Sequence, residues 1–395
     1  MRFELSEEQQ TYRQKLRAYF DRVINPRMDE LRREMKQSRE GGGPIFRSIL
    51  EQMGADGYLG IGWPTEYGGQ GRGPIEQYVF TEEVQRTGFP LPFLTLNTVG
   101  PTIRRFGSET QKADFLPKVL AGKLLFAIGY SEAEAGTDLA GLKTKAERDG
   151  DHWVINGAKM WTSLADHADY IWLAARTDPQ APKHKGISMF LVPTTSEGYK
   201  CVPITTIGGV RTNATFYENV RVPAENLIGG ENLGWSLITG QLNEERVSLS
   251  NFAPIERLLG ETVAWARETK LADGTRAIDR PFVRSNLARV HAKVRALKLL
   301  NFRLAWNAQH QTLHPADASA VKVYGSEFYV EAYNALLECF GVLGAVQDAS
   351  PGAILRGRVE SSYRNTLILT FGGGTNEVQR DIIAMTKLAM PHYKN

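Results

Sequence analysis

The sequence of 395 residues has little cysteine and almost no excess of one charge. Its two cysteines, Cys201 and Cys339, stand far apart and form neither a metal-ligand cluster nor a disulfide framework. This usage argues against a disulfide-stapled secreted scaffold and favours a reducing cytoplasm. The formal net charge is only +3, and no basic stripe is interleaved with aromatic residues, so nucleic acid is not an expected partner.

Long apolar runs and the common nucleotide motifs are also missing. No run reaches the ~20 residues that a membrane-spanning helix needs, and residues 1–10 are too polar and acidic for a signal peptide, so we expect no membrane insertion. The sequence has no P-loop, no GxGxxG motif after a strand and no metal-ligand spacing among its seven histidines. The stretch Gly129 to Ala133 resembles a nucleophile elbow but lacks its final glycine, which argues against a serine hydrolase.

Turn and hydrophobic patterns divide the chain into helical, β and helical segments. The middle segment contains the runs 170–175, 187–192 and 214–222, which are typical of strands. Asn156-Gly157 follows the apolar run 153–155, and this dipeptide predicts a tight hairpin turn. We therefore predict a helical domain at 1–126, a β domain at 127–230 and a second helical domain at 231–395.

The last segment carries two helical signals. The first is an apolar stripe at spacings of four, three, four and three, which predicts one face of a long helix: Val283, Leu287, Val290, Val294 and Leu297. The second is Asn376 followed three residues later by Gln379, a capping-box pattern that predicts the start of the last helix at Asn376.

Three stretches, taken together and in this order, carry a resemblance. They are residues 128–140 (IGYSEAEAGTDLA), 155–163 (INGAKMWTS) and 371–380 (FGGGTNEVQR). With the loop 63–69 (WPTEYGG) and the segment 222–229 (VPAENLIG), they resemble the acyl-CoA dehydrogenase family over essentially the whole chain. The resemblance implies an α+β fold with an N-terminal helical domain, a middle β-barrel or sandwich domain and a C-terminal four-helix bundle.

The resemblance also implies FAD as cofactor and assigns residues to it. Tyr130 lies in the loop expected along the flavin, and Ser131, which replaces the usual Thr, would hydrogen-bond the flavin ring. Thr137 matches a small hydroxyl residue that reaches the flavin or the CoA arm. Trp161 matches an aromatic packed beside the isoalloxazine, and Ser163 a hydroxyl near its reactive nitrogen.

The glycine-rich stretch before the last helix is expected to receive the adenosine half of FAD. A helix N-terminus favours phosphate or another polar group, and Thr375 and Glu377 are the candidate contacts. Glu377 departs from the commoner Gln. Because a carboxylate would repel a pyrophosphate, we expect Glu377 to face adenine or ribose.

The family reaction removes the α proton of an acyl-CoA with a carboxylate while a β hydride passes to the flavin. Many members carry this base at the position of Gly373, which can do no proton chemistry. A minority supply it from a Glu-Arg pair on an earlier helix, which Glu245 and Arg246 match. We therefore predict Glu245 as the base and Arg246 as a substrate-side residue; a solvated charged helix face is the alternative for this run.

Two further departures bear on assembly. Lys270 to Gly274 and Glu338 to Gly344 stand where relatives carry FAD contacts to a neighbouring subunit. These changes are similar to a bacterial subgroup that acts on bulky CoA thioesters, including steroid side chains, and that pairs different subunits in some members. We expect lipid or steroid β-oxidation on a branched or cyclic acyl group.

The expected partners are an acyl-CoA substrate and an electron-transfer flavoprotein, within a homo-oligomer (dimer or tetramer) or a heterotetramer with a related subunit. Two other functions stay open. One is a non-catalytic or half-site subunit of a heteromeric enzyme, favoured by the Lys270 and Glu338 regions. The other is a flavin oxidase or monooxygenase relative.

Overall fold

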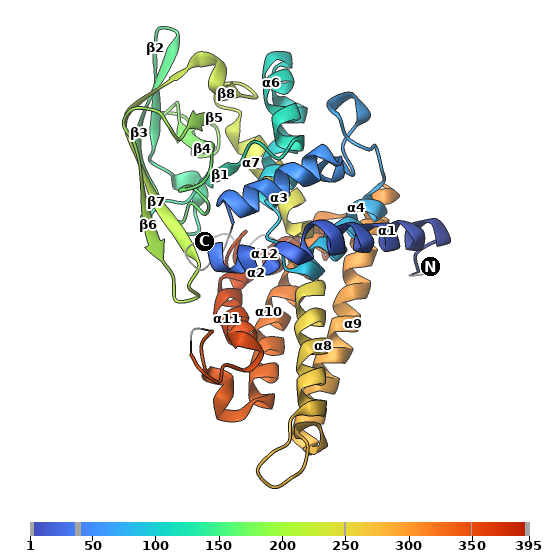
Figure 1. The fold of residues 1–395 in the computed structure, drawn as a ribbon. Coiled ribbons are helices and arrows are strands. Elements are labelled where there is room, and N and C mark those ends of the chain that lie inside the picture. The colour runs from blue at the N-terminus through green and yellow to red at the C-terminus, as the bar shows by residue number, and fades with distance from the viewer. Residues whose placement is uncertain (1–3, 36–40, 249, 349, 392–395) are drawn as a thin grey trace.

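The computed structural model describes residues 4–35, 41–248, 250–348 and 350–391, and only the backbone of residues 242–248. These residues form N-terminal helices, a middle β-sheet domain and a C-terminal helical domain (Figure 1). The predicted α+β class with helical, β and helical parts is confirmed. The domain boundaries at 126/127 and 230/231 stay predictions.

The N-terminal region packs its helices around one apolar core. Capping boxes at Ser6 and Ser108 start the first and last of these helices, because each serine accepts a backbone N–H three residues on. The helices are α1 (Glu7–Val23), α2 (Met28–Glu34), α3 (Pro44–Ala55), α4 (Pro74–Thr87), α5 (Gly100–Phe106) and α6 (Glu109–Leu120).

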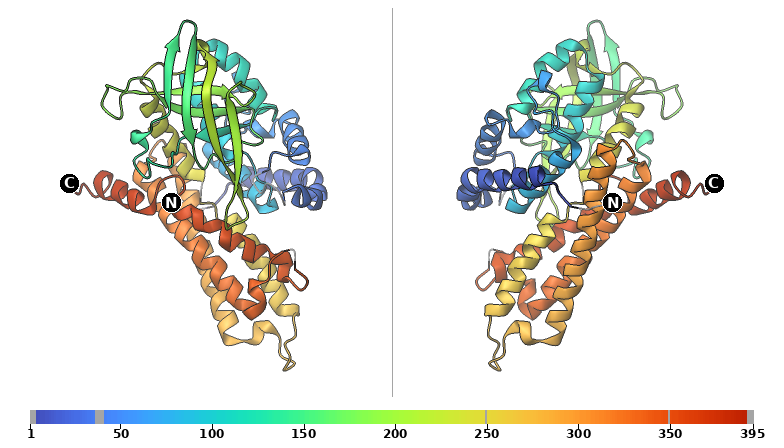
Figure 2. Two further views of the ribbon diagram at one scale, coloured as in Figure 1. Left: turned by 90° about the vertical axis from the view of Figure 1, so that its left-hand side faces the viewer. Right: turned by 90° about the vertical axis from the view of Figure 1, so that its right-hand side faces the viewer.

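The middle domain is built on a mainly antiparallel sheet (Figure 2). Among the described residues its strands are β1 (Phe126–Gly129), β2 (Lys145–Asp149), β3 (His152–Lys159), β4 (Tyr170–Arg176), β5 (Ile187–Pro193), β6 (Tyr199–Thr205), β7 (Arg211–Pro223) and β8 (Leu227–Ile228). The strand order is β6-β7-β3-β2-β4-β5-β8, and β1 pairs with β4 in parallel. The ends of β1 and β3 turn out to hold the candidate site.

The hairpin predicted at Asn156-Gly157 is wrong. β3 runs through both residues and pairs with β2 and β7, while the tight turn lies at Gly150, between β2 and β3. The register against β7 shifts between Ile155 and Gly157, which marks a β-bulge. A Cβ on Gly157 would lie 2.6 Å from Oγ1 of Thr144, so this glycine serves a close backbone approach.

The C-terminal domain is helical, with α8, α9, α10 and α11 packed as neighbours (Figure 1). Its helices are α7 (Gly234–Ser248), α8 (Ala253–Glu268), α9 (Pro281–Gln309), α10 (Pro315–Cys339), α11 (Arg358–Thr366) and α12 (Asn376–Thr386). All five stripe residues of α9 are buried, so the predicted long helix is confirmed. The last helix, α12, packs against α10 through Gln379, which accepts from the hydroxyl of Ser319 at 2.9 Å, and its C-terminal end projects beyond the bundle (Figure 2).

The predicted cap of α12 is wrong by one residue. Thr375 is the N-cap: its backbone is extended, and its Oγ1 accepts the N–H of Val378 at 3.2 Å. Asn376 is the first helical residue, and its side chain is buried, where Oδ1 accepts from Nζ of Lys322 at 2.8 Å. Because Lys322 of α10 engages the Asn376 side chain, that side chain does not cap α12.

Two adjacent buried carboxylates on α4 join the N-terminal helices to the C-terminal domain. Glu82 accepts from Nη2 of Arg13 at 2.7 Å, and Glu83 accepts from Nε of Arg17 at 2.8 Å, both arginines belonging to α1. Nζ of Lys298, on α9, lies 3.8 Å from Glu82. We call the residues Arg13, Arg17, Glu82, Glu83 and Lys298 the carboxylate network.

We expect Glu83→Ala to lower the free energy of unfolding by about 3 kcal/mol, because it strands arginines that are partly withdrawn from water. Urea denaturation measures this loss. The matched control is Glu109→Ala, which removes an exposed carboxylate that pairs with Lys112 at 2.8 Å and should cost less than about 1 kcal/mol. Equal losses in the two variants would contradict a structural role for the network.

Candidate functional site

The site begins where β1 and β3 end side by side. The backbone N–H of Met160, after β3, donates to the carbonyl of Ser131, after β1, at 2.8 Å. Nζ of Lys159 donates to the carbonyl of Tyr130 at 3.1 Å and to Oε1 of Glu132 at 2.8 Å. These bonds fix the loop that follows β1 against the end of β3.

Lys159 is 1% exposed, so its charge is almost fully withdrawn from water. Burial lowers the pKa of Lys159 to about 8, against the opposing effect of Glu132. Burial alone would raise the pKa of Glu132, but the charge and hydrogen bond of Lys159 outweigh it and hold that pKa below its ordinary value. Glu132 also accepts the backbone N–H of Lys143 at 2.6 Å and of Thr144 at 2.9 Å, so one carboxylate organises both arms of the loop.

Trp161 follows directly after this anchored end of β3. Its side chain is 56% exposed, and its backbone adopts φ 63, a left-handed conformation that is uncommon for a bulky residue. The flanking backbone is held because the N–H of Thr162 donates to the carbonyl of Asn213 at 2.9 Å. An exposed indole on an anchored segment is suited to stack against a planar ring.

A buried polar cluster joins the loop to helix α7. Nε1 of Trp172, on β4, donates to the hydroxyl of Tyr130 at 2.9 Å and to Oε1 of Gln241, on α7, at 3.0 Å. The hydroxyl of Tyr130 also donates to Oε1 of Gln241. Gln241 is only 2% exposed, so its position, and with it that of α7, is tied to the loop.

The predicted base and its neighbour, Glu245 and Arg246, follow Gln241 in the same helix. The backbone of both residues is helical, and their side chains lie outside the described residues. Gly373, at the alternative base position, has φ 70, a conformation that L side chains rarely adopt.

Comparison with known proteins follows the same three-part division. Family models match residues 6–123 (acyl-CoA dehydrogenase, N-terminal domain), 127–220 (middle domain) and 232–388 (C-terminal domain). Acyl-CoA dehydrogenase FadE26 of Mycobacterium tuberculosis is 52% identical over 99% of this chain and 99% of its own length. The chain belongs to the acyl-CoA dehydrogenase family. It is therefore an oxidoreductase, and the family implies a flavin cofactor.

Other relatives cover the whole length of this dehydrogenase. Acyl-CoA dehydrogenase FadE29 of Mycobacterium tuberculosis is 46% identical over 99% of each chain. The crystal structure of the ChsE4-ChsE5 complex from Mycobacterium tuberculosis superposes with a TM-score of 0.92 at 52% identity, covering 100% of both chains. A structure described as the Tcur3481-Tcur3483 steroid ACAD gives a TM-score of 0.92 at 47% identity over 100% of both chains.

The structure brings together four of the predicted flavin residues in this dehydrogenase. Tyr130, Ser131, Trp161 and Ser163 lie at the joined strand ends, and the N–H of Ser163 donates to the carbonyl of Trp161 at 3.0 Å. Thr137 is exposed on the same loop. The exposed Ser131 hydroxyl and the Trp161 indole fit a flavin, since one offers a hydrogen bond and the other a stacking face.

Thr375 and Glu377 form a separate group at the start of α12. Thr375 caps the helix, Glu377 is exposed in its first turn, and Nζ of Lys322 donates to the carbonyl of Gly374 at 2.7 Å. Lys322 is buried in α10, so its hydrogen bond to Gly374 holds this glycine-rich stretch against the bundle. Such a helix start is a suitable place for a nucleotide.

The two departures noted in the sequence lie at the far end of the bundle. In the α8–α9 connection, the backbone of Lys270 pairs with that of Arg276 in an isolated β-bridge. Glu338 accepts from Nδ2 of Asn286, on α9, at 2.8 Å. Trp265 and Phe340 meet edge to face nearby, with ring centroids 4.7 Å apart.

Sequence reasoning missed Lys159, Glu132 and Gln241. Gln241 could have been found from the sequence. It lies four residues after Leu237 and three after Ile238, on the apolar face of the same helix, where a polar side chain is unexpected. Lys159 had a signal as well, since it shares the alternation of the buried Trp153 and Ile155 along β3, which places its side chain inside.

The buried lysine predicts a pH dependence of stability. Its ordinary pKa is 10.5, so between about pH 8 and 10.5 the unfolded chain holds a proton that the folded chain lacks, and Lys159 makes stability rise with pH. We expect the difference in unfolding free energy between wild type and Lys159→Met to shift in favour of wild type across this window. Urea titrations at several pH values measure it; a difference independent of pH would show that Lys159 titrates normally.

Proposed function

We propose that this dehydrogenase uses FAD to introduce an α,β double bond into an acyl-CoA thioester, with Glu245 as the base. The observation that carries the proposal is the hydrogen-bonded link from Tyr130 through Gln241 to α7. It ties the loop assigned to the flavin to the helix that contains Glu245, four residues beyond Gln241. Base and cofactor must keep a fixed separation for the two hydrogens to leave together, and this link supports such a separation.

The candidate FAD residues fall into two groups. Ser131, Thr137, Trp161 and Ser163 would hold the flavin, with Trp161 beside the ring and Ser131 donating to it. Thr375 and Glu377 would receive the adenosine half at the helix start that Lys322 anchors. FAD would supply the acceptor for the β hydride, and these residues would bind and orient it.

Glu245 would remove the α proton, which the thioester carbonyl makes acidic. Its carboxylate must act in a dry pocket that brings its pKa closer to the working pH. Arg246 would contact the substrate or orient the carboxylate. The left-handed backbone at Gly373 supports the assignment, because a glutamate would be strained at that position.

The acyl group is proposed to be bulky, branched or cyclic. A glycine at position 373 leaves room where many relatives place a carboxylate. One structure at 47% identity is described as a steroid ACAD, which supports a steroid side chain as one such group.

We propose that the electron acceptor is an electron-transfer flavoprotein. We also propose that the chain assembles with a related subunit into a heteromeric complex. The ChsE4-ChsE5 structure is a complex of this kind at 52% identity. Large apolar side chains lie exposed near the end of the bundle and before α12, as expected of a protein interface: Val342, Leu343, Ile368 and Phe371. The cytoplasmic location stays a prediction from cysteine usage.

A half-site role is the second candidate, favoured by Lys270 and Glu338. Both occupy positions where relatives supply FAD contacts to a neighbour. Glu338 is engaged by Asn286 within this chain, whereas Lys270 pairs with Arg276 through the backbone. In that case the chain contributes some flavin sites of a complex and leaves others incomplete.

Glu245→Gln tests the base. We expect flavin reduction by a reactive acyl-CoA to slow by at least about 100-fold, because general-base catalysis is lost while the amide keeps the size of the side chain. Anaerobic stopped-flow measurement of flavin absorbance gives the rate. Glu244→Gln is the matched control and should keep the wild-type rate, since adjacent helical residues project about 100° apart. If Glu245→Gln reduces as fast as wild type, the base is elsewhere.

The assembly is tested by purifying the chain alone and with a co-expressed related subunit. We expect flavin to be retained at full occupancy only in the complex, because the Lys270 and Glu338 regions do not offer the usual contacts. The ratio of flavin to protein absorbance reports occupancy, and a panel of straight, branched and steroidal thioesters then identifies the acyl group. A chain that is fully loaded alone and active on straight thioesters would contradict both parts of the proposal.

A further inference from the structure

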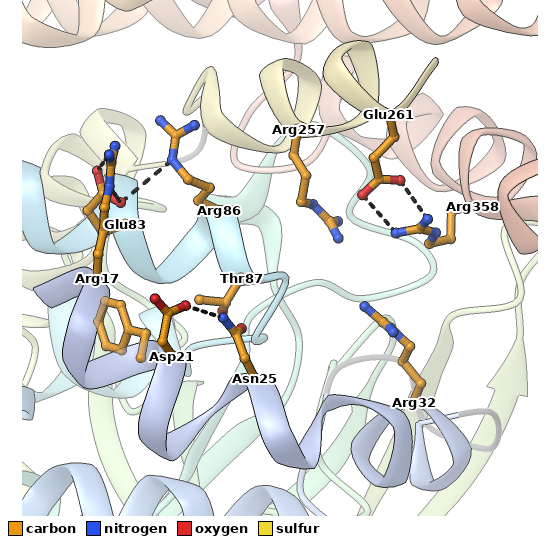
Figure 3. A pocket seen from close by; sticks show the side chains of 11 residues that line it. Arg17, Asp21, Asn25, Arg32, Glu83, Arg86, Thr87, Arg257, Glu261 and Arg358 are labelled. Carbon is orange, nitrogen blue, oxygen red and sulfur yellow. Dashed lines mark hydrogen bonds and ion pairs between the residues drawn. The ribbon is translucent and has the colours of Figure 1, made fainter. Parts of the chain in front are cut away.

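A cavity of about 480 Å³ lies between the N-terminal helices and the C-terminal domain (Figure 3), and none of its lining residues within the described ranges belongs to the loop at β1 and β3. One side is made by the N-terminal helices α1, α2 and α4, and the other by α8 and α11 of the C-terminal domain. Among the described residues that line it are five arginines: Arg17, Arg32, Arg86, Arg257 and Arg358. Three acidic residues, Asp21, Glu83 and Glu261, line it as well, so an excess of two positive charges faces the space.

All three acidic groups are already engaged. Glu83 accepts from Nε of Arg17 at 2.8 Å and belongs to the carboxylate network. Glu261 forms a bidentate ion pair with Arg358: Nη1 lies 2.9 Å from Oε1, and Nη2 lies 2.6 Å from Oε2. Asp21 accepts from Nδ2 of Asn25 at 2.6 Å.

Arg257 is the unusual group of the cavity. It projects from α8 into the open space between the two walls (Figure 3), and its Nε is buried without a hydrogen-bond partner in the described part of the chain. Burial lowers the pKa of Arg257; Glu261 acts against this, while the charges of Arg358 and Arg32 lower it further. A withdrawn guanidinium near two other guanidiniums is unfavourable unless an anion shares the space.

We propose that this cavity binds a small organic anion with two or more phosphate or carboxylate groups, with Arg257 as its central contact and Arg32 and Arg358 beside it. The planar guanidinium presents donors in a fork that matches two oxygens of such a group. The volume falls within the ~300–1,000 Å³ of small-ligand pockets, and an interface between domains is a common place for them.

The walls suggest what binding would do. The anion would join α2 to α8 and α11, which come from opposite ends of the chain. It would therefore favour one placement of the N-terminal helices against the bundle, in addition to the placement set by the carboxylate network. This inference does not depend on the reaction proposed above.

Isothermal titration calorimetry at low ionic strength, with inorganic pyrophosphate and citrate as separate probes, tests the proposal on the full chain as purified. We expect at least one probe to bind wild type and Arg257→Gln to weaken that binding about tenfold, the value of one charge-assisted contact. The matched control is Arg267→Gln, which removes an exposed arginine from the same helix and should leave binding unchanged. The tighter probe identifies the anion as a phosphate or a carboxylate.

A second variant protects the test against misfolding. Arg32→Gln alters the opposite wall from a partly exposed position on α2 and should also weaken binding if the anion lies between the walls. Far-UV circular dichroism checks that each variant is folded. Pyrophosphate can also occupy a nucleotide site elsewhere, so only binding that depends on Arg257 or Arg32 counts. The proposal is overturned if neither probe binds wild type, or if the folded variants bind as wild type does.

Discussion

The arrangement of the domains depends on two neighbouring carboxylates that are buried on α4. Withdrawing Glu82 and Glu83 from water costs several kcal/mol each, and this cost is offset only if cations reach them from more than one side. Arg13 and Arg17 reach them from α1, and Lys298 approaches from α9. The network therefore permits one relative placement of α1, α4 and α9, which makes its contribution one of orientation more than of net stability.

The same constraint operates on a smaller scale at the site. Lys159 is buried only because Glu132 and the carbonyl of Tyr130 receive its ammonium group, and Glu132 in turn holds two backbone N–H groups of the returning chain. The loop from 130 to 144 has little regular structure of its own. The buried Lys159–Glu132 pair holds its two ends, and Nη2 of Arg176, on β4, donates to the carbonyl of Ala140 at 2.6 Å. The exposed Ser131 and Thr137 therefore lie on a loop that neighbouring strands support.

Sequence patterns predicted features that depend on the periodicity of one helix, and missed features that depend on contacts with other elements. The stripe of α9 is a property of one helix and was found, whereas Asn156-Gly157 has the composition of a turn and is a bulge, because Thr144 packs against it from another strand. The cap of α12 shifted to Thr375 because Lys322, some fifty residues away, engages Asn376. The flavin-loop residues came from family resemblance, and no local pattern distinguished the buried Glu82 and Glu83 of α4 from a solvated helix face.

The contrast between Gly373 and Glu245 concerns backbone as much as side chain. A glutamate at φ 70 would carry roughly 1–2 kcal/mol of strain, so this loop could not take the base back without a change of conformation. A helix accepts a glutamate without such strain, and α7 is further held by Gln241 against Tyr130 and Trp172. A base on α7 would therefore have less conformational freedom than one on the loop, and its distance to the flavin would be more nearly fixed. That constraint would suit the bulky acyl group proposed above, because the position of the base would then be set by the protein and not by the packing of the substrate.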